Sequence, residues 1–159
     1  MGKHVILEKK YYFQIDNYET ERNLLMTKKE TAINLHDQKY NCAQSVACAF
    51  AEEVGVDKEV LFRACEGFGL GMGCMEGTCG AISGAVMLAS FKNSDGQIDN
   101  PTTKQSTYAL ARTIIEKFQE KNKATRCRDL KGVDTGTMLR SCPGCIEDAV
   151  EIVQEVLGL

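Results

Sequence analysis

Helix-start signals recur along most of this chain, and they constrain its fold more than any other feature. A Ser, Thr, Asp or Asn placed before an apolar run can accept the first free N–H groups of a helix. Residues of this kind stand at five places: Thr27 (three residues before Glu30, as in a capping box), Asn41, Asp57, Asn100 (before Pro101) and Ser141. Together with apolar residues at helical spacing, they predict helices over roughly residues 27–40, 41–54, 57–64, 79–91, 100–118 and 141–157.

A glycine-rich loop over residues 67–77 interrupts this helical pattern. Such glycine density breaks a helix and permits left-handed or closely packed backbone. Beyond residue 26 there is no strand alternation and no rhythm of alternating strands and helices. The fold class that follows is all-α, a helical bundle of about six helices with a glycine-rich loop.

The length of 159 residues fits one domain. We expect a helical cysteine-rich domain over residues 27–159, preceded by an N-terminal extension over residues 1–26. The extension has two short apolar runs but no clear period, so we predict a short non-helical N-terminal arm. The pattern leaves open whether this arm is a hairpin, a partner-binding segment or a tail.

Charge and hydropathy exclude several functional classes. The net charge is −3 and Lys and Arg are scattered, whereas a nucleic-acid-binding face would be basic. No apolar run approaches the ~18 residues of a membrane span. The N-terminus lacks the apolar core of an export signal, so we expect a cytoplasmic location. There is no G-x-S-x-G and no His beside a Cys in a convincing order, so the sequence supports no hydrolase.

The chain contains eight cysteines, which is an unusual number for a protein of this length in a reducing compartment. Structural disulfides are rare there, and grouped cysteines more often indicate metal or redox chemistry. Free Cys also packs as a small apolar residue, so we expect about half of them to be only core residues. The eight are Cys42, Cys48, Cys65, Cys74, Cys79, Cys127, Cys142 and Cys145.

Three of these cysteines, Cys42, Cys79 and Cys142, stand at predicted helix starts. A helix N-terminus offers free N–H donors and a partial positive charge, and both favour thiolate over thiol. Thiolate is the form that attacks disulfides and binds metals. We therefore expect a shared sulfur site if these helix ends converge. The alternative is that the helix ends lie apart and that the cysteines occupy them by chance.

The segment from Cys142 to Cys145 is a C-x-x-C at a helix start. In thioredoxin-like proteins this layout forms a reversible disulfide, although their usual strand and helix surroundings are missing here. A structural zinc site is a minority interpretation, because no second C-x-x-C exists and neither His4 nor His36 has ligand spacing. Cys127 stands between two arginines, whose positive charges would favour its thiolate. An equally open interpretation is that this segment is a solvated basic turn in which the cysteine has no function.

Gly80 and Gly84 form a small-xxx-small pair on the helix that starts near Cys79. Such a pair more often indicates close helix packing than function. Because nothing bulky intervenes there, other sulfurs could approach Cys79, and our hypothesis places both glycines at the cofactor-binding site. The spacing of Cys74 and Cys79 matches the start of a plant-type iron–sulfur motif. The match is incomplete, because Ile82 stands where that motif needs its next cysteine.

The string Cys-Gly-Ala-Ile-Ser-Gly at residues 79–84, with Cys42 upstream and Cys127 and Cys142 downstream, resembles the C-GCAxxG-C-C family of redox-active proteins. The similarity covers roughly residues 28–157. By that resemblance Cys48, Cys65, Cys74 and Cys145 are additional to the four family cysteines. The resemblance implies redox activity. Related domains occur in split-Soret cytochromes, which bind haem. This chain has no haem attachment motif, so the resemblance implies only the cysteine chemistry of those proteins and not haem binding.

Three functional hypotheses follow. The first is electron transfer or redox sensing through an iron–sulfur centre, such as [2Fe–2S], held by Cys42, Cys79, Cys127 and Cys142. The second is a thiol–disulfide redox protein without metal, in which Cys142 or Cys79 attacks and Cys145 resolves. The third is a helical interaction module with structural cysteines or a structural metal. We expect the partner to be a redox protein, a small thiol or a small electron carrier. A helical bundle with such an arm could also form a homodimer. The sequence leaves open whether the chain is an enzyme.

Overall fold

The computed structural model of the chain describes residues 26–159. The predicted N-terminal arm, residues 1–26, therefore lies outside the described residues apart from Met26. Every regular element in residues 26–159 is a helix, and the one β-bridge joins Thr78 to Arg126. The all-α prediction is confirmed for this part of the chain.

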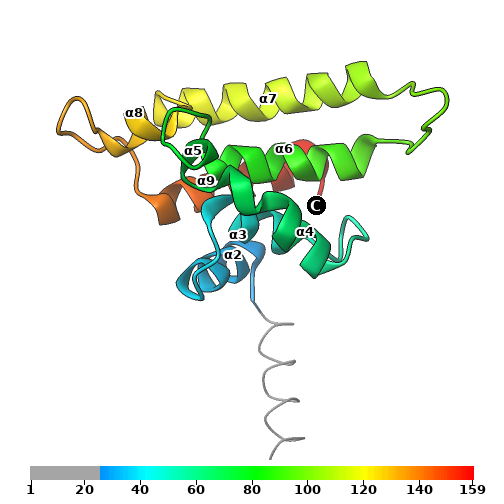
Figure 1. The fold of residues 1–159 in the computed structure, drawn as a ribbon, viewed down its shortest axis with the longest axis horizontal. Helices are drawn as coiled ribbons and strands as arrows, with labels where there is room; N and C mark the ends of the chain where they lie inside the picture. The colour runs from blue at the N-terminus through cyan, green and yellow to red at the C-terminus, as the bar shows by residue number, and fades with distance from the viewer. Residues whose placement is uncertain (1–25) are drawn as a thin grey trace, which may run out of the picture.

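The helices pack around a central pair, α6 and α9 (Figure 1). The long helix α7 lies along α6 and also contacts α9, while α3 packs against α6 from the other side. Helix α2 contacts α3 and α9, and α4 contacts α3. The bounds are α2 (Lys28–Asp37), α3 (Cys42–Cys48), α4 (Lys58–Cys65), the 3₁₀ turn η1 (Glu66–Phe68), α5 (Gly69–Met72), α6 (Gly80–Asn93), α7 (Lys104–Asn122), α8 (Cys127–Lys131) and α9 (Cys142–Leu157).

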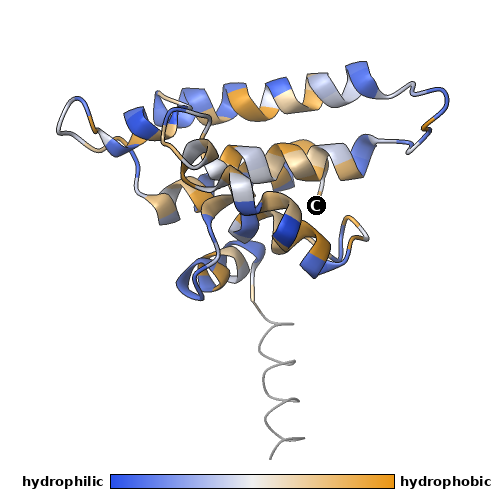
Figure 2. Cartoon of the chain, in the orientation of Figure 1, coloured by the Kyte–Doolittle hydropathy of each residue, from blue (hydrophilic) through white to orange (hydrophobic). Residues whose placement is uncertain are grey.

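The core is built mainly from apolar side chains on α3, α6 and α9. Hydrophobic residues concentrate on α6 and α9, whereas α2, α7 and the loops carry many hydrophilic ones (Figure 2). Burial of this apolar area is the main force that holds the helices together. The largest fully buried apolar side chains are Val46, Phe50, Leu61, Ile82, Leu88, Ile114, Phe118, Leu130, Ile146, Val150 and Val153.

Four of the predicted caps form as expected. Thr27 and Glu30 make a complete capping box, and Asn41 makes another with Gln44. The Asp57 side chain accepts a hydrogen bond from an N–H of the first turn of α4, at 2.7 Å. The Ser141 hydroxyl accepts one from the Gly144 N–H at 3.2 Å in the first turn of α9. These bonds fix where α2, α3, α4 and α9 begin.

The predicted start of the fifth helix at Asn100 and Pro101 is wrong, because α7 begins at Lys104. The carboxylate of Asp95 accepts a 2.6 Å hydrogen bond from the Thr102 hydroxyl, which holds the preceding residues in a loop. Helix α3 also ends earlier than predicted, at Cys48.

Three apolar or aromatic side chains that stand at helical spacing in α4 and α7 are exposed. The exposed fractions of Val60, Tyr108 and Ile115 are 54%, 55% and 38%. Helix α4 buries Leu61 and Cys65, and α7 buries Ile114 and Phe118, so each helix contacts the core along a narrower stripe than its sequence suggests.

The glycine-rich loop folds back onto α8. Leu70, Met72 and Met75 have left-handed backbone with φ of 52°, 62° and 65°, which is rare for residues with a side chain. Gly71 also has a positive φ of 57°, and a Cβ there would lie 2.6 Å from the Cys127 Cβ. The loop thus approaches α8 closely enough that only glycine fits at this point.

Candidate functional site

A cavity of about 200 Å³ lies where the N-terminal ends of several helices meet. Five of the eight cysteines line this thiol cavity, and the glycine-rich loop contributes Leu70 to its wall. Leu130 and the half-buried Lys131 come from α8. The full lining is His36, Asn41, Cys42, Leu70, Cys79, Gly80, Cys127, Leu130, Lys131, Cys142 and Cys145.

Four of the cavity cysteines stand at helix starts. Cys42, Cys127 and Cys142 are the first residues of α3, α8 and α9, and Cys79 is the N-cap of α6. Cys145 lies three residues into α9, so its side chain shares a face with that of Cys142. The structure thus brings together all five cysteines singled out from the sequence, although their roles stay predictions. The helix start at Cys127 was not predicted, because no capping side chain precedes it.

Cys42 and Cys142 are a pair of neighbouring cysteines, with their sulfurs within 4.8 Å of each other. The proton that Cys42 donates lowers the pKa of Cys142 to about 5, and Lys131 also favours the thiolate. The same bond, together with burial, raises the pKa of Cys42. Within this pair the thiolate form is therefore favoured on Cys142 over Cys42.

Cys79 and Cys145 form a second pair of the same kind. The hydrogen bond from Cys145 lowers the pKa of Cys79 to about 7, and the N–H groups of Ala81 and Ile82 in the first turn of α6 add to the effect. The pKa of Cys145 is raised by this bond and by burial. Each cysteine of the C-x-x-C thus interacts most strongly with a sulfur on another helix, and not with the other cysteine of its own segment.

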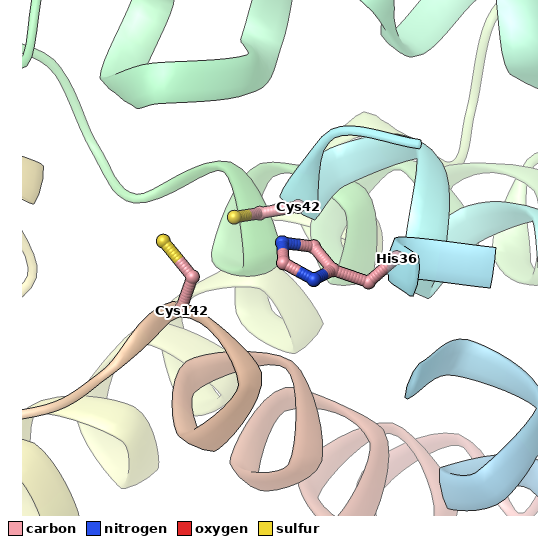
Figure 3. A group of neighbouring side chains, drawn as sticks. All are labelled: His36, Cys42 and Cys142. Atoms are coloured by element: carbon pink, nitrogen blue, oxygen red, sulfur yellow. The ribbon is translucent and has the colours of Figure 1, made fainter. Parts of the chain in front are cut away.

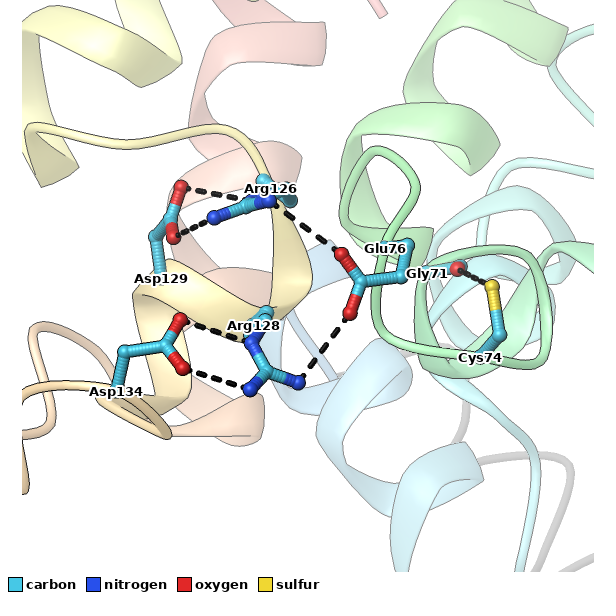
Figure 4. A network of polar contacts seen from close by, with 7 residues as sticks. All are labelled: Gly71, Cys74, Glu76, Arg126, Arg128, Asp129 and Asp134. Carbon is cyan, nitrogen blue, oxygen red and sulfur yellow. Dashed lines mark hydrogen bonds and ion pairs between the residues drawn. The ribbon is translucent and has the colours of Figure 1, made fainter.

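The prediction that two arginines would favour the Cys127 thiolate is wrong. Burial raises the pKa of Cys127, and neighbouring sulfurs raise it further. Arg126 pairs with Asp129, Arg128 pairs with Asp134, and both guanidinium groups also contact Glu76 (Figure 4). Because these charges are already paired on the surface, the arginines attach the glycine-rich loop to α8 instead of acting on the thiol.

Lys131 is a cation that acts on the sulfurs of the cavity, and sequence reasoning missed it. Burial opposes its charged form, but a hydrogen bond with Cys142 and the charges of the other sulfurs raise the pKa of Lys131. Lys131 follows Cys127 by four residues, one helical turn, so its position could have been found once α8 was recognised.

His36 is the second residue that sequence reasoning missed. One of its ring nitrogens and the sulfurs of Cys42 and Cys142 all lie within 4.8 Å of one another. The three side chains come from α2, α3 and α9 and point toward one another (Figure 3). The spacing from His36 to Cys42 matches no linear metal motif, because a turn at residues 38–41 separates the two helices. This group could hold a metal ion.

The two glycines of the predicted cofactor site have different surroundings. A Cβ at Gly80 would lie 2.9 Å from the Phe68 carbonyl oxygen and 3.3 Å from the Cys42 Cβ, and Gly80 lines the cavity. A Cβ at Gly84 would lie 2.5 Å from the Ala43 carbonyl oxygen, and Gly84 does not line the cavity. Gly84 therefore sets the close approach of α3 and α6.

The remaining cysteines lie outside the thiol cavity. Cys48 and Cys65 are buried, and burial raises the pKa of each to about 11. Cys74 is exposed on the glycine-rich loop, where its thiol contacts the Gly71 carbonyl oxygen at 3.7 Å. A larger cavity of about 820 Å³ has only one cysteine, Cys48, in its lining, so it offers no group of sulfurs.

Replacing Lys131 with glutamine is expected to slow alkylation of Cys142 at pH 6 by about twofold, because a rise of its pKa by about one unit would roughly halve the thiolate at this pH. Loss of the cation disfavours the thiolate, so the pKa of Cys142 rises and less of the reactive form is present. The measurement is the rate of iodoacetamide modification at Cys142, followed by mass spectrometry against pH in reduced, metal-free protein. Lys92→Gln, an exposed lysine outside the cavity lining, is the matched control. An unchanged pH profile would show that Lys131 does not act on this thiol.

The fold and the cavity define an all-α, cysteine-rich protein with thiols gathered at helix N-termini. The chain belongs to the C-GCAxxG-C-C family, whose sequence model, described as "Putative redox-active protein (C_GCAxxG_C_C)", matches residues 40–156. No curated protein and no solved structure matches the chain. Within residues 26–159 the longest apolar helices are too short or too polar to cross a lipid bilayer.

Proposed function

We propose that the thiol cavity binds an iron–sulfur centre through which the protein transfers or senses electrons. The observation that carries the proposal is the gathering of five cysteine side chains around one cavity of about 200 Å³. Thiolates are the ligands of iron–sulfur clusters, and membership of a family described as redox-active supports the same chemistry.

The residues present fit such a centre. Cys42, Cys79, Cys127 and Cys142 would hold it, and two of them, Cys79 and Cys142, have a lowered pKa before any metal binds. Lys131 would offset part of the negative charge of four thiolates. The helix N-terminal N–H groups would donate to the sulfurs and so adjust the reduction potential. When bound, the centre supplies one-electron chemistry.

The cavity wall also suits a one-electron carrier. Leu70 and Leu130 supply apolar surface that limits the access of water to the sulfurs. Leu70 is 49% exposed, so this residue of the cavity lining also faces solvent, and a redox partner or a small electron carrier could approach there.

The test is iron and acid-labile sulfide analysis on protein purified without oxygen, together with absorbance and electron paramagnetic resonance spectra. We expect iron and sulfide in equal amounts, visible absorbance bands that bleach on reduction, and a signal in one oxidation state. Colourless protein with neither iron nor sulfide, both as purified and after reconstitution, would refute the proposal.

A second candidate function, reversible disulfide formation, is favoured by the two cysteine pairs. Each pair could reduce a disulfide substrate: the thiolate attacks one sulfur, the substrate's other sulfur leaves as a thiolate, and the partner thiol then resolves the mixed disulfide. Each such cycle oxidises two thiols to one disulfide and transfers two electrons and two protons to the substrate. In the first pair Cys142 would attack and Cys42 would resolve.

For this second function we expect oxidised protein to contain the bonds Cys42–Cys142 and Cys79–Cys145. Each sulfur would join the sulfur with which it already shares a proton. The measurement is disulfide mapping by mass spectrometry after mild oxidation of metal-free protein. A predominant Cys142–Cys145 bond would contradict the expectation and would favour a C-x-x-C mechanism of the thioredoxin kind.

A further inference from the structure

We propose that His36 is a metal ligand and shares one metal ion with Cys42 and Cys142. The inference rests on the proposed function only in that the thiol cavity must bind metal. It adds an imidazole to a site for which the cysteine pattern predicts sulfur ligands alone. It therefore changes the expected chemistry of the centre.

The geometry of this trio is the first support. One nitrogen and two sulfurs lie within 4.8 Å of one another, a span that a single ion can bridge. Among the His, Cys, Asp and Glu residues of the described chain, no other group of three meets this condition. The three residues come from α2, α3 and α9, so one ion would join two consecutive helices near residue 40 to a helix that begins at Cys142 (Figure 3).

The chemistry of the cavity is the second support. No carboxylate lines it, so it does not suit calcium or magnesium, which prefer oxygen ligands. Sulfur and imidazole together suit iron, zinc and related first-row ions. On binding, Cys42 and Cys142 would coordinate the ion as thiolates and would release any proton they carry to solvent.

A structural role is the alternative explanation for His36. The residue lies in the last turn of α2, where a positive side chain interacts favourably with the helix dipole. That role needs no contact with the sulfurs and would change stability without changing a metal spectrum. A spectroscopic readout therefore separates the two.

The first experiment uses cobalt(II) as the probe, added anaerobically to the reduced, metal-free full-length chain. We expect thiolate-to-cobalt charge-transfer bands and visible ligand-field bands in the wild type. In His36→Ala we expect an affinity at least about tenfold weaker and altered visible bands. His36→Cys restores a ligand and is expected to recover the affinity with more intense charge transfer.

The matched control is Asp37→Ala, the exposed neighbour of His36 on the same helix. It should bind cobalt as the wild type does. Circular dichroism and the urea midpoint of each variant verify that it is folded. Should His36→Ala fail to fold, His36→Gln replaces it as the ligand deletion. Cobalt spectra and affinities identical to wild type in the folded His36 deletion would overturn the inference.

The second experiment separates this inference from the proposed function. In anaerobic protein that contains iron and sulfide, pulsed electron paramagnetic resonance should show nitrogen coupling that is lost in the His36 deletion. A cluster without this coupling overturns the His36 inference and leaves the iron–sulfur proposal intact. Protein without iron or sulfide refutes the iron–sulfur proposal, whereas a His36-dependent cobalt spectrum in the same preparation supports the ligand.

Discussion

Replacing Cys142 with serine is expected to abolish the metal centre, with iron content falling at least about tenfold. Cys142 belongs to the trio with His36 and to the pair with Cys42, and it carries the lowest pKa among the cavity thiols, about 5. Serine keeps the size of the side chain and the helix start, but its hydroxyl is a poor ligand for iron. Iron and sulfide analysis with absorbance spectroscopy measures the loss.

The control for this variant is Cys74→Ser, because Cys74 is exposed and lies outside the thiol cavity. Its iron content should equal that of the wild type. If Cys142→Ser kept a full complement of iron and the same spectrum, Cys142 would not be a ligand and the centre would have to use other sulfurs. Because the serine variant keeps the hydroxyl cap at Ser141, its urea midpoint should equal that of wild-type protein when both are reduced and free of metal.

Replacing Gly84 with valine is expected to lower the free energy of unfolding by about 3 kcal/mol. A Cβ at this position would lie 2.5 Å from the Ala43 carbonyl oxygen, a backbone atom that cannot rotate away. Helix α3 would have to separate from α6, although the two pack closely along their length. Since α3 carries Cys42, the thiol cavity should also lose metal affinity. Urea denaturation and cobalt titration measure the two effects.

Gly67→Ala is the matched control for this substitution, because a Cβ at Gly67 would meet nothing within 4 Å and its φ is not left-handed. Its stability should stay within about 0.5 kcal/mol of the wild type. An equally mild effect for Gly84→Val would mean that α3 and α6 have room to adjust. In that case Gly84 would have no role in packing.

The parts of the fold that could be predicted from the sequence are those set by local signals. Thr27, Asn41, Asp57 and Ser141 each cap a helix through bonds to residues two or three positions away, so the sequence itself contains both partners. The start of α7 could not be found in this way. It depends on Asp95, which lies seven residues before the Thr102 that it holds in the loop.

Among the residues of the candidate site that act on the chemistry, only the cysteines could be predicted from the sequence. Three stand at capped or glycine-bounded helix starts, and the cysteine spacing resembles that of a family. His36 and Lys131 carry no such signal, because they reach the sulfurs through the packing of α2 and α8. Arg126 and Arg128 gave a wrong prediction for the Cys127 thiolate. They neighbour Cys127 in the sequence, but their side chains pair with carboxylates on the surface.

The thiol pair of Cys42 and Cys142 joins two ends of the domain, since the residues are 100 positions apart in the sequence. A covalent cross-link there would close a loop of about 100 residues and would restrict the unfolded chain by roughly 4 to 5 kcal/mol. A metal ion shared by the same residues would act in the same direction. The oxidation or metal state of the cavity would therefore set the melting temperature of the whole domain. The resistance of the domain to proteolysis would then depend on the redox potential of its surroundings.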